Sequence, residues 1–143
     1  MEWLKEILPD AGRVVTDGIE ERYLSDTLGR LRGRAAALVF VESTEEVSGI
    51  LREAHRRGVP VTPRGAGTNL VGSTVPADGG IVLDFTRMNR ILELDRDTMT
   101  VTVEPGILLE DLQRYVENEG LFYPPDPGEK TSTVGGNVST NAG

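Results

Sequence analysis

The stretch from residue 63 to residue 73, PRGAGTNLVGS, holds three glycines among polar side chains and constrains the fold more than any other segment. It directly follows an apolar run around Val59 and Val61 that predicts a strand. Glycine lets the backbone adopt positive φ, and because it has no Cβ atom it also lets a ligand come close. A loop of this kind can turn several backbone N–H groups toward one anion, which is how proteins hold a pyrophosphate with few charged side chains.

A second segment of similar character, residues 131–143 with the sequence TSTVGGNVSTNAG, closes the chain. One glycine-rich polar loop is a weak signal, but two of them in 143 residues predict a dinucleotide with two contact zones. Two common nucleotide motifs do not match. The Rossmann pattern requires a glycine at the position of Leu70. The P-loop pattern requires glycine directly followed by lysine, whereas here Glu129 stands between Gly128 and Lys130.

Composition narrows the ligands and partners that suit this chain. The net charge is −8, and residues 65–143 carry 5 Lys/Arg against 12 Asp/Glu, which argues against nucleic acid as a partner. A phosphate bound in this half must therefore rely on backbone N–H groups and hydroxyls. With no cysteine and one histidine in the sequence, we expect no metal site. No apolar run reaches the roughly 18 residues of a membrane-spanning helix, and the acidic N-terminus is not a secretory signal, so we expect a cytoplasmic location.

Hydrophobic periodicity predicts an α+β fold. A short helix before Pro9 leads into a polar stretch, residues 12–34, which we interpret as a surface wrap with a helical turn. Ser43 and Glu46 form a capping box at the start of a helix that ends at Gly58, and the flanking strands complete a βαβ unit. We expect this unit to pack with the later strands and the last helix to cover one face of that sheet. The expected elements are strands at 35–41, 59–63, 80–85, 91–95 and 99–104, helices at 43–58 and 108–119, a hairpin turn at Arg96-Asp97, and a strand end at Glu104-Pro105-Gly106. We expect a loop-like stretch from residue 121 onward, and we expect its last part, 131–143, to be mobile.

This order of elements, together with both glycine-rich segments, resembles the FAD-linked oxidases of the vanillyl-alcohol oxidase type, which share an FAD-binding PCMH-type domain. The resemblance runs from about residue 23 to residue 143, and the nearest look-alikes are the glycolate oxidase flavoprotein subunit and the D-lactate and D-2-hydroxyglutarate dehydrogenases. It implies an N-terminal helical wrap at 1–34 and an FAD-binding PCMH-type domain at 35–143, made of the first α/β subdomain and the start of the second. Because such enzymes are several times longer, it also implies an N-terminal fragment with an incomplete domain.

In that family the first glycine-rich loop wraps the FAD pyrophosphate through backbone amides. The second segment contacts the pyrophosphate, the ribityl chain and the isoalloxazine. The resemblance therefore implies cofactor-binding residues in both segments: Arg64, Gly65, Ala66, Gly67, Thr68, Asn69, Gly72 and Ser73 in the first, and Pro125, Asp126, Ser132, Thr133, Gly135, Gly136, Asn137, Ser139 and Thr140 in the second. Members that bind FAD covalently place a histidine in the first loop, so non-covalent FAD is implied here.

The function that the resemblance implies is the FAD-binding part of a flavin-dependent 2-hydroxy acid oxidase or dehydrogenase, of the glycolate or D-lactate type. Its catalytic residues are expected beyond residue 143, so this chain alone is expected to be inactive and to bind FAD weakly or not at all. A 2-hydroxy acid substrate, an electron-accepting partner subunit and self-association of the fragment are further expectations. The alternative is a non-catalytic fragment or interaction module that keeps the fold without flavin.

Overall fold

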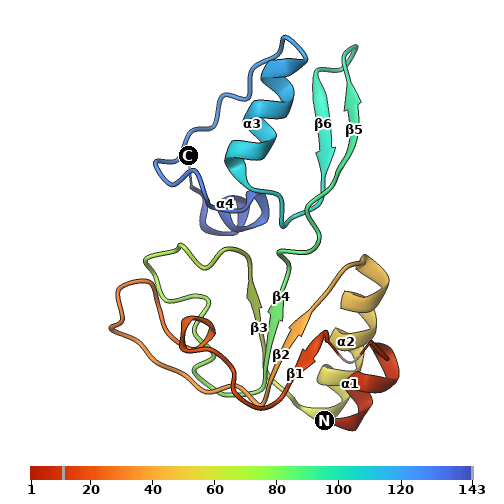
Figure 1. Ribbon diagram of the computed structural model, residues 1–143, viewed down its shortest axis with the longest axis vertical. Helices are drawn as coiled ribbons and strands as arrows, with labels where there is room; N and C mark the ends of the chain where they lie inside the picture. Colours follow the sequence, from red (N-terminus) through yellow and green to blue (C-terminus); the bar gives the residue numbers. More distant parts are fainter. Residues whose placement is uncertain (11, 143) are drawn as a thin grey trace.

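A four-stranded sheet forms the first part of the molecule (Figure 1). The structure is a computed structural model, which describes residues 1–10 and 12–142. The strands of this sheet lie in the order β1-β2-β4-β3, which are Val14–Val15, Ala37–Phe40, Ile81–Asp84 and Val61–Arg64. Strands β2, β4 and β3 are parallel, and β1 is antiparallel to β2. The predicted βαβ unit is confirmed, with β4 lying between its two strands.

Both faces of this sheet are covered. Successive side chains of the central strands β2 and β4 point to opposite sides, and the side chains on both sides are buried. Helices α1 (Glu2–Ile7) and α2 (Thr44–Arg57) cover one face (Figure 1). The core on that side consists of Trp3, Leu4, Leu8, Ala37, Val39, Val41, Ile50, Ala54, Ile81, Leu83 and Met88. On the opposite face, Leu38 and Val82 pack against Tyr23, which belongs to the short 3-10 helix Glu21–Tyr23. The stretch expected as a surface wrap therefore contributes to the core.

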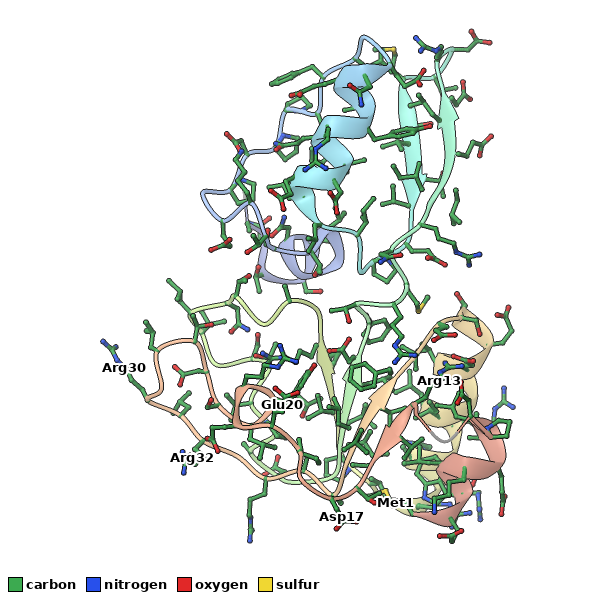
Figure 2. All side chains as sticks on the ribbon, in the orientation of Figure 1. Met1, Arg13, Asp17, Glu20, Arg30 and Arg32 are labelled. Atoms are coloured by element: carbon green, nitrogen blue, oxygen red, sulfur yellow. The ribbon has the colours of Figure 1, made fainter. Side chains whose placement is uncertain are left out.

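The N-terminal segment also supplies strand β1, which the sequence did not predict. Two valines are too short a run to show the alternation that marks a strand. Arg13 attaches this edge to α2, since its Nη1 donates to Glu46 Oε1 at 2.8 Å and its Nε donates to the Phe40 carbonyl at 3.1 Å (Figure 2). Arg30 and Arg32 lie at the outer side of the same segment and point away from the sheet (Figure 2).

The predicted limits of α2 are confirmed by its caps. Ser43 Oγ accepts a hydrogen bond from the Glu46 amide at 3.2 Å, and Glu46 Oε2 reaches back to the amide of Glu42 at 2.8 Å. Gly58 ends the helix with φ of 63°, the left-handed conformation that glycine adopts without strain.

The second part of the molecule is a separate two-stranded sheet, β5 (Ile91–Asp95) and β6 (Thr100–Val103), with α3 (Leu109–Asn118) packed against it. Its own core is formed by Ile107, Leu112 and Val116 together with Ile91, Val101, Val103, Tyr115, Leu121, Tyr123 and Val134. The hairpin itself is confirmed. Our expectation that the hairpin joins the first sheet, with the helix at 108–119 covering one face of that sheet, was wrong. The first sheet is already covered on both faces, so the hairpin buries its apolar side chains against α3 instead.

The last segment contains a helix, α4 (Val134–Thr140), where we expected a loop-like tail. Two adjacent glycines and several Ser, Thr and Asn residues lower the intrinsic helix propensity, which is why the sequence did not indicate it. Thr133 caps the N-terminus of the helix from within the segment. Contacts from outside the segment also hold the helix, because the amides of Val134 and Gly135 donate to the carbonyls of Ile107 and Pro105, each at 2.9 Å. Tertiary contacts thus override local propensity.

Glu104, which we read only as the end of a strand, is a buried carboxylate at the base of the hairpin. It is 6% exposed and accepts from the backbone amide of Arg90 at 2.8 Å and from Arg90 Nη2 at 2.6 Å. The hydrogen bond from the Arg90 side chain is the main reason that the pKa of Glu104 lies below its ordinary value. The pair fixes the entry and exit of the hairpin relative to each other.

We expect Glu104→Gln to lower the free energy of unfolding at pH 7 by about 1 kcal/mol, since one charge-assisted hydrogen bond is lost. A carboxylate with a lowered pKa stabilises the fold above its unfolded-state pKa, and that contribution is lost as the pH falls through the folded-state value. The difference between the two proteins should therefore shrink below pH 4.5, the ordinary value for this group. Urea unfolding at a series of pH values measures it, and a difference that grows on acidification would contradict the assignment.

Candidate functional site

The first glycine-rich loop begins where β3 ends, at Arg64, on the side of the sheet that faces α4 (Figure 1). Within the described residues, none of the backbone amides of 65–70 donates a hydrogen bond. Gly67 has φ of 77° and Gly72 has φ of 71°, so the chain turns here through conformations that favour glycine. A row of unpaired amides in a tight turn is an anion-binding arrangement.

Hydrogen bonds made by side chains hold the loop in shape. Asn69 Oδ1 accepts from the amide of Ser73 at 3.1 Å, and Asn69 Nδ2 donates to Thr74 Oγ1 at 3.0 Å. From the N-terminal segment, Thr27 Oγ1 donates to the carbonyl of Gly67 at 2.8 Å. Both side chains engage polar groups on the loop and leave the amides of 65–70 free.

The two glycine-rich segments, which the sequence predicted as two contact zones of one dinucleotide, are in direct contact with each other. Thr133 is 2% exposed, and its hydroxyl lies against Gly65 so closely that a Cβ atom at residue 65 would stand 2.1 Å from Thr133 Oγ1. A bridge between Leu108 and Thr133 joins the second segment to the start of α3. The loop of the first part and the helix of the second therefore form one continuous surface.

The second segment differs from the first in that its amides are already paired. Besides the two bonds to Ile107 and Pro105, the amide of Gly136 donates to Thr133 Oγ1 at 3.3 Å. The backbone of Gly135 lies close to Pro105 rather than to a ligand site, because a Cβ atom on Gly135 would stand 2.7 Å from the Cβ of Pro105. This glycine is required for packing between the segment and the hairpin.

The other sequence-predicted residues of the second segment also contact protein. Ser132 Oγ donates to the carbonyl of Glu129 at 2.7 Å, Ser139 Oγ to that of Gly135 at 2.7 Å, and Thr140 Oγ1 to that of Gly136 at 2.9 Å; Asp126 pairs with Lys130, and the Pro125 carbonyl accepts from Gln113 at 3.4 Å. Asn137 is half-buried at the middle of α4, and Ala66 and Thr68 are half-buried in the first loop. The structure thus brings Gly65 and Thr133 together but leaves Pro125 and Asp126 on an exposed stretch.

A cleft of about 270 Å³ opens beside the first loop, at the ends of β3 and β4. It is lined by Arg22, Tyr23, Arg64, Gly65, Ala66, Asp84 and Thr86. The guanidinium of Arg64 lies 5.3 Å from the centre of the Tyr23 ring, and the side chain is buried at 7% exposure. The cleft therefore joins the loop to the N-terminal segment and to the end of the central strand.

Asp84 is the most deeply buried charged group in this cleft, at 1% exposure. Burial raises the pKa of Asp84, although its Oδ1 accepts from the Thr86 amide at 2.8 Å. Burial likewise lowers the pKa of Arg64. Each charge is thus removed from water without a close partner of opposite sign, an arrangement that a polar ligand can relieve.

Sequence reasoning missed Asp84 and Tyr23 as members of the site. Asp84 carried a usable signal, because it is a charged residue inside the strand sequence GIVLDF, where a buried carboxylate requires a reason. The sequence around Tyr23 gave no signal of a role in the site, since only the fold brings the N-terminal segment beside the end of β3.

The structure also bears on metal binding and on membrane-spanning helices. Among the residues that the structure describes, no three His, Cys, Asp or Glu side chains gather in a way that suits a metal ion. No helix in the ranges 1–10 and 12–142 combines the length and apolar character needed to cross a membrane.

Comparison with known proteins gives a consistent answer. The family described as FAD binding domain matches residues 35–143. Over 145 residues the chain is 46% identical to a D-lactate dehydrogenase of Anaerostipes hadrus, covering 100% of the chain and 30% of that protein. Over 135 residues it is 44% identical to the glycolate oxidase subunit GlcD of Bacillus subtilis, covering 94% of the chain and 27% of that protein.

The fold comparison agrees with the sequence comparison. A solved structure of an alkyldihydroxyacetonephosphate synthase superposes with a TM-score of 0.83 at 25% identity, covering 97% of this chain and 31% of that protein. The chain spans about 30% of the length of the curated relatives it matches. The surface between the first loop and α4 therefore lies within the part that all these proteins have in common.

Proposed function

This chain belongs to the FAD binding domain family, and on that premise we propose that it is the FAD-binding part of a flavin-dependent 2-hydroxy acid oxidase or dehydrogenase. FAD, when bound, supplies the hydride-accepting chemistry, while the protein supplies binding and orientation. The chemistry named for the relatives, D-lactate dehydrogenase and glycolate oxidase, supports a small 2-hydroxy acid as substrate.

The observation that carries this proposal is the row of unpaired amides at residues 65–70. A pyrophosphate presents several oxygen acceptors, and a set of backbone donors can bind them without adding charged side chains. At Gly65 and Gly67 the space of a Cβ atom is taken by Thr133 Oγ1 and Arg64 Nη2, so glycine at these two positions lets both side chains pack against the loop. The residues that are present therefore fit the group that the family binds.

We propose different roles for the two segments. The first loop binds the pyrophosphate through its amides, while Asn69, Gly72 and Ser73 maintain the turn. The second segment forms the opposite wall, where its amides support α4, Thr133 joins the wall to Gly65 and caps the helix, and Asn137 faces the cofactor. The remaining residues expected in that segment, Pro125, Asp126, Ser132, Gly135, Gly136, Ser139 and Thr140, shape that wall. We propose that no residue of this chain binds FAD covalently, because the sequence has no cysteine and its one histidine, His55, lies in α2.

We assign no catalytic residue to this chain. The relatives are about three times as long, so the substrate pocket, the catalytic groups and the contacts to an electron-accepting partner subunit are proposed to lie in residues outside this sequence. The walls around adenine and isoalloxazine are proposed to lie there as well. Burial of such rings contributes a large share of binding.

The test compares the full-length protein with the isolated 143-residue chain. We expect the full-length protein to purify yellow, with one FAD per chain and D-lactate or glycolate oxidation. The isolated chain should bind FAD more weakly than micromolar, because pyrophosphate hydrogen bonds of about 0.5–1.5 kcal/mol each do not offset the cost of association. A colourless full-length protein that does not take up FAD would favour the alternative, an interaction module that keeps the fold without flavin.

A further inference from the structure

We propose that the side chain of Arg64 binds a phosphate group of the ligand held by the first loop, in addition to the backbone amides. This inference rests on the proposed function and deepens it, since it assigns a positive charge to a site that the sequence described as backbone and hydroxyls only. Three observations support it: the burial of Arg64, its lack of a protein partner and its position beneath the loop.

The guanidinium of Arg64 is buried with no ion pair or side-chain hydrogen bond among the residues described, although the charge of Asp84 in the same cleft favours its charged form. The residue is 7% exposed, and its Nη1 is a buried nitrogen with no hydrogen-bond partner among the residues described. Moving a charge out of water is costly unless hydrogen bonds or an ion pair replace the water. The face of Tyr23, whose centre is 5.3 Å away, offsets only part of this cost. A buried, unpaired arginine thus remains ready to bind an anion.

The position of this guanidinium connects it to the loop. A Cβ atom on Gly67 would stand 2.0 Å from Arg64 Nη2, so the guanidinium lies directly against the backbone of Gly67. The amides of 65–70 and the N–H groups of Arg64 are therefore donors within one small region. Arginine presents its N–H groups in a planar fork that matches phosphate oxygens, and such charge-assisted bonds are roughly twice as strong as neutral ones.

An alternative role for Arg64 is to neutralise the charge of Asp84, which lines the same cleft. The coordinates do not favour it, because no ion pair joins these two residues within the described part of the chain, whereas Arg13, Arg87 and Arg90 each pair with a carboxylate. Asp84 instead uses its Oδ1 to accept from Thr86. The two readings predict opposite effects of removing the guanidinium.

The experiment uses the full-length apoprotein and the variant Arg64→Gln, with FAD binding followed by quenching of flavin fluorescence and stability followed by thermal unfolding without ligand. We expect the dissociation constant for FAD to rise 10- to 100-fold and the unfolding temperature to stay level or rise, because an uncompensated buried charge is removed. Inorganic pyrophosphate should raise the unfolding temperature of the wild-type protein and have little effect on the variant. The control Arg96→Gln removes the same charge from the hairpin turn, where Arg96 pairs with Glu119, and should bind FAD as the wild type does.

The outcomes separate this inference from the proposed function. If the wild-type protein does not bind FAD, the proposed function fails. If it binds FAD and Arg64→Gln binds equally well, or is destabilised with its affinity unchanged, the role of Arg64 is structural and the inference fails. Should the variant not fold, a crystal structure of the wild-type protein with FAD decides: a phosphate oxygen within about 3.2 Å of a guanidinium nitrogen supports the proposal, and an Arg64–Asp84 ion pair in its place overturns it.

Discussion

Replacing Gly67 by aspartate is expected to yield a full-length protein that folds but purifies without flavin. Gly67 has φ of 77°, a region that costs other residues about 1–2 kcal/mol. The new Cβ atom would also stand 2.0 Å from Arg64 Nη2 and displace the guanidinium. The added carboxylate would lie among the donors proposed for the pyrophosphate, where like charges cost several kcal/mol. Affinity for FAD should therefore fall at least ~100-fold.

The matched control for this variant is Gly120→Asp. Gly120 has φ of 74°, and a Cβ atom there would meet nothing within 4 Å, so the backbone strain and the charge are the same while the loop is untouched. The ratio of flavin to protein absorbance in the purified proteins is the measurement. Full flavin content in Gly67→Asp, or equal flavin loss in both variants, would show that the first loop does not hold the pyrophosphate.

The second large effect is expected at Gly106, where the chain leaves the hairpin. A Cβ atom on this residue would stand 1.9 Å from the carbonyl oxygen of Phe85 and 2.7 Å from that of Met88. Both contacts are with backbone, and the amide of Gly106 already donates to the Met88 carbonyl at 2.7 Å, so neither of these two connecting segments can shift without loss of this bond. We expect Gly106→Ala to lower the free energy of unfolding by about 3 kcal/mol.

Urea unfolding of the full-length protein measures this effect, with Gly128→Ala as its control. Gly128 is exposed, and a Cβ atom there would meet nothing within 4 Å, so the same substitution should change the stability by less than about 0.5 kcal/mol. Equal stability of the two variants would mean that the junction can relax around an added methyl group.

The sequence was sufficient to predict those elements whose signals are local. The capping box at Ser43, the helix end at Gly58 and the β5–β6 hairpin each depend on a few neighbouring residues, and all three are present in the structure. The predicted alternation holds in β6 but not in β5, where the register is irregular between Ile91 and Glu93. The sequence predicted two contact zones for one dinucleotide, but it predicted the second segment to be mobile rather than packed against the first. That Gly65 packs directly on Thr133 could not be predicted, since it depends on contacts between distant segments.

What the sequence could not predict was set by tertiary structure. Helix α4 forms on a glycine-rich segment because the carbonyls of Pro105 and Ile107 accept its first amides. The cleft contains Tyr23 and Asp84, which are separated by some sixty residues and are brought together only by the sheet. Arg64 was expected from the sequence as a cofactor-binding residue of the loop, but a role for its side chain is indicated only by the burial of that side chain without a partner.

The separation of the two hydrophobic cores has a consequence for how the molecule unfolds. The first core lies on the four-stranded sheet and the other between α3 and the hairpin, and no strand is shared between them. Without a ligand, each core can melt in its own transition. A cofactor held between the first loop and α4 adds its binding free energy to both at once. Saturation with FAD should therefore fuse two calorimetric peaks into one, so that the cofactor sets the cooperativity of the fold as well as its chemistry.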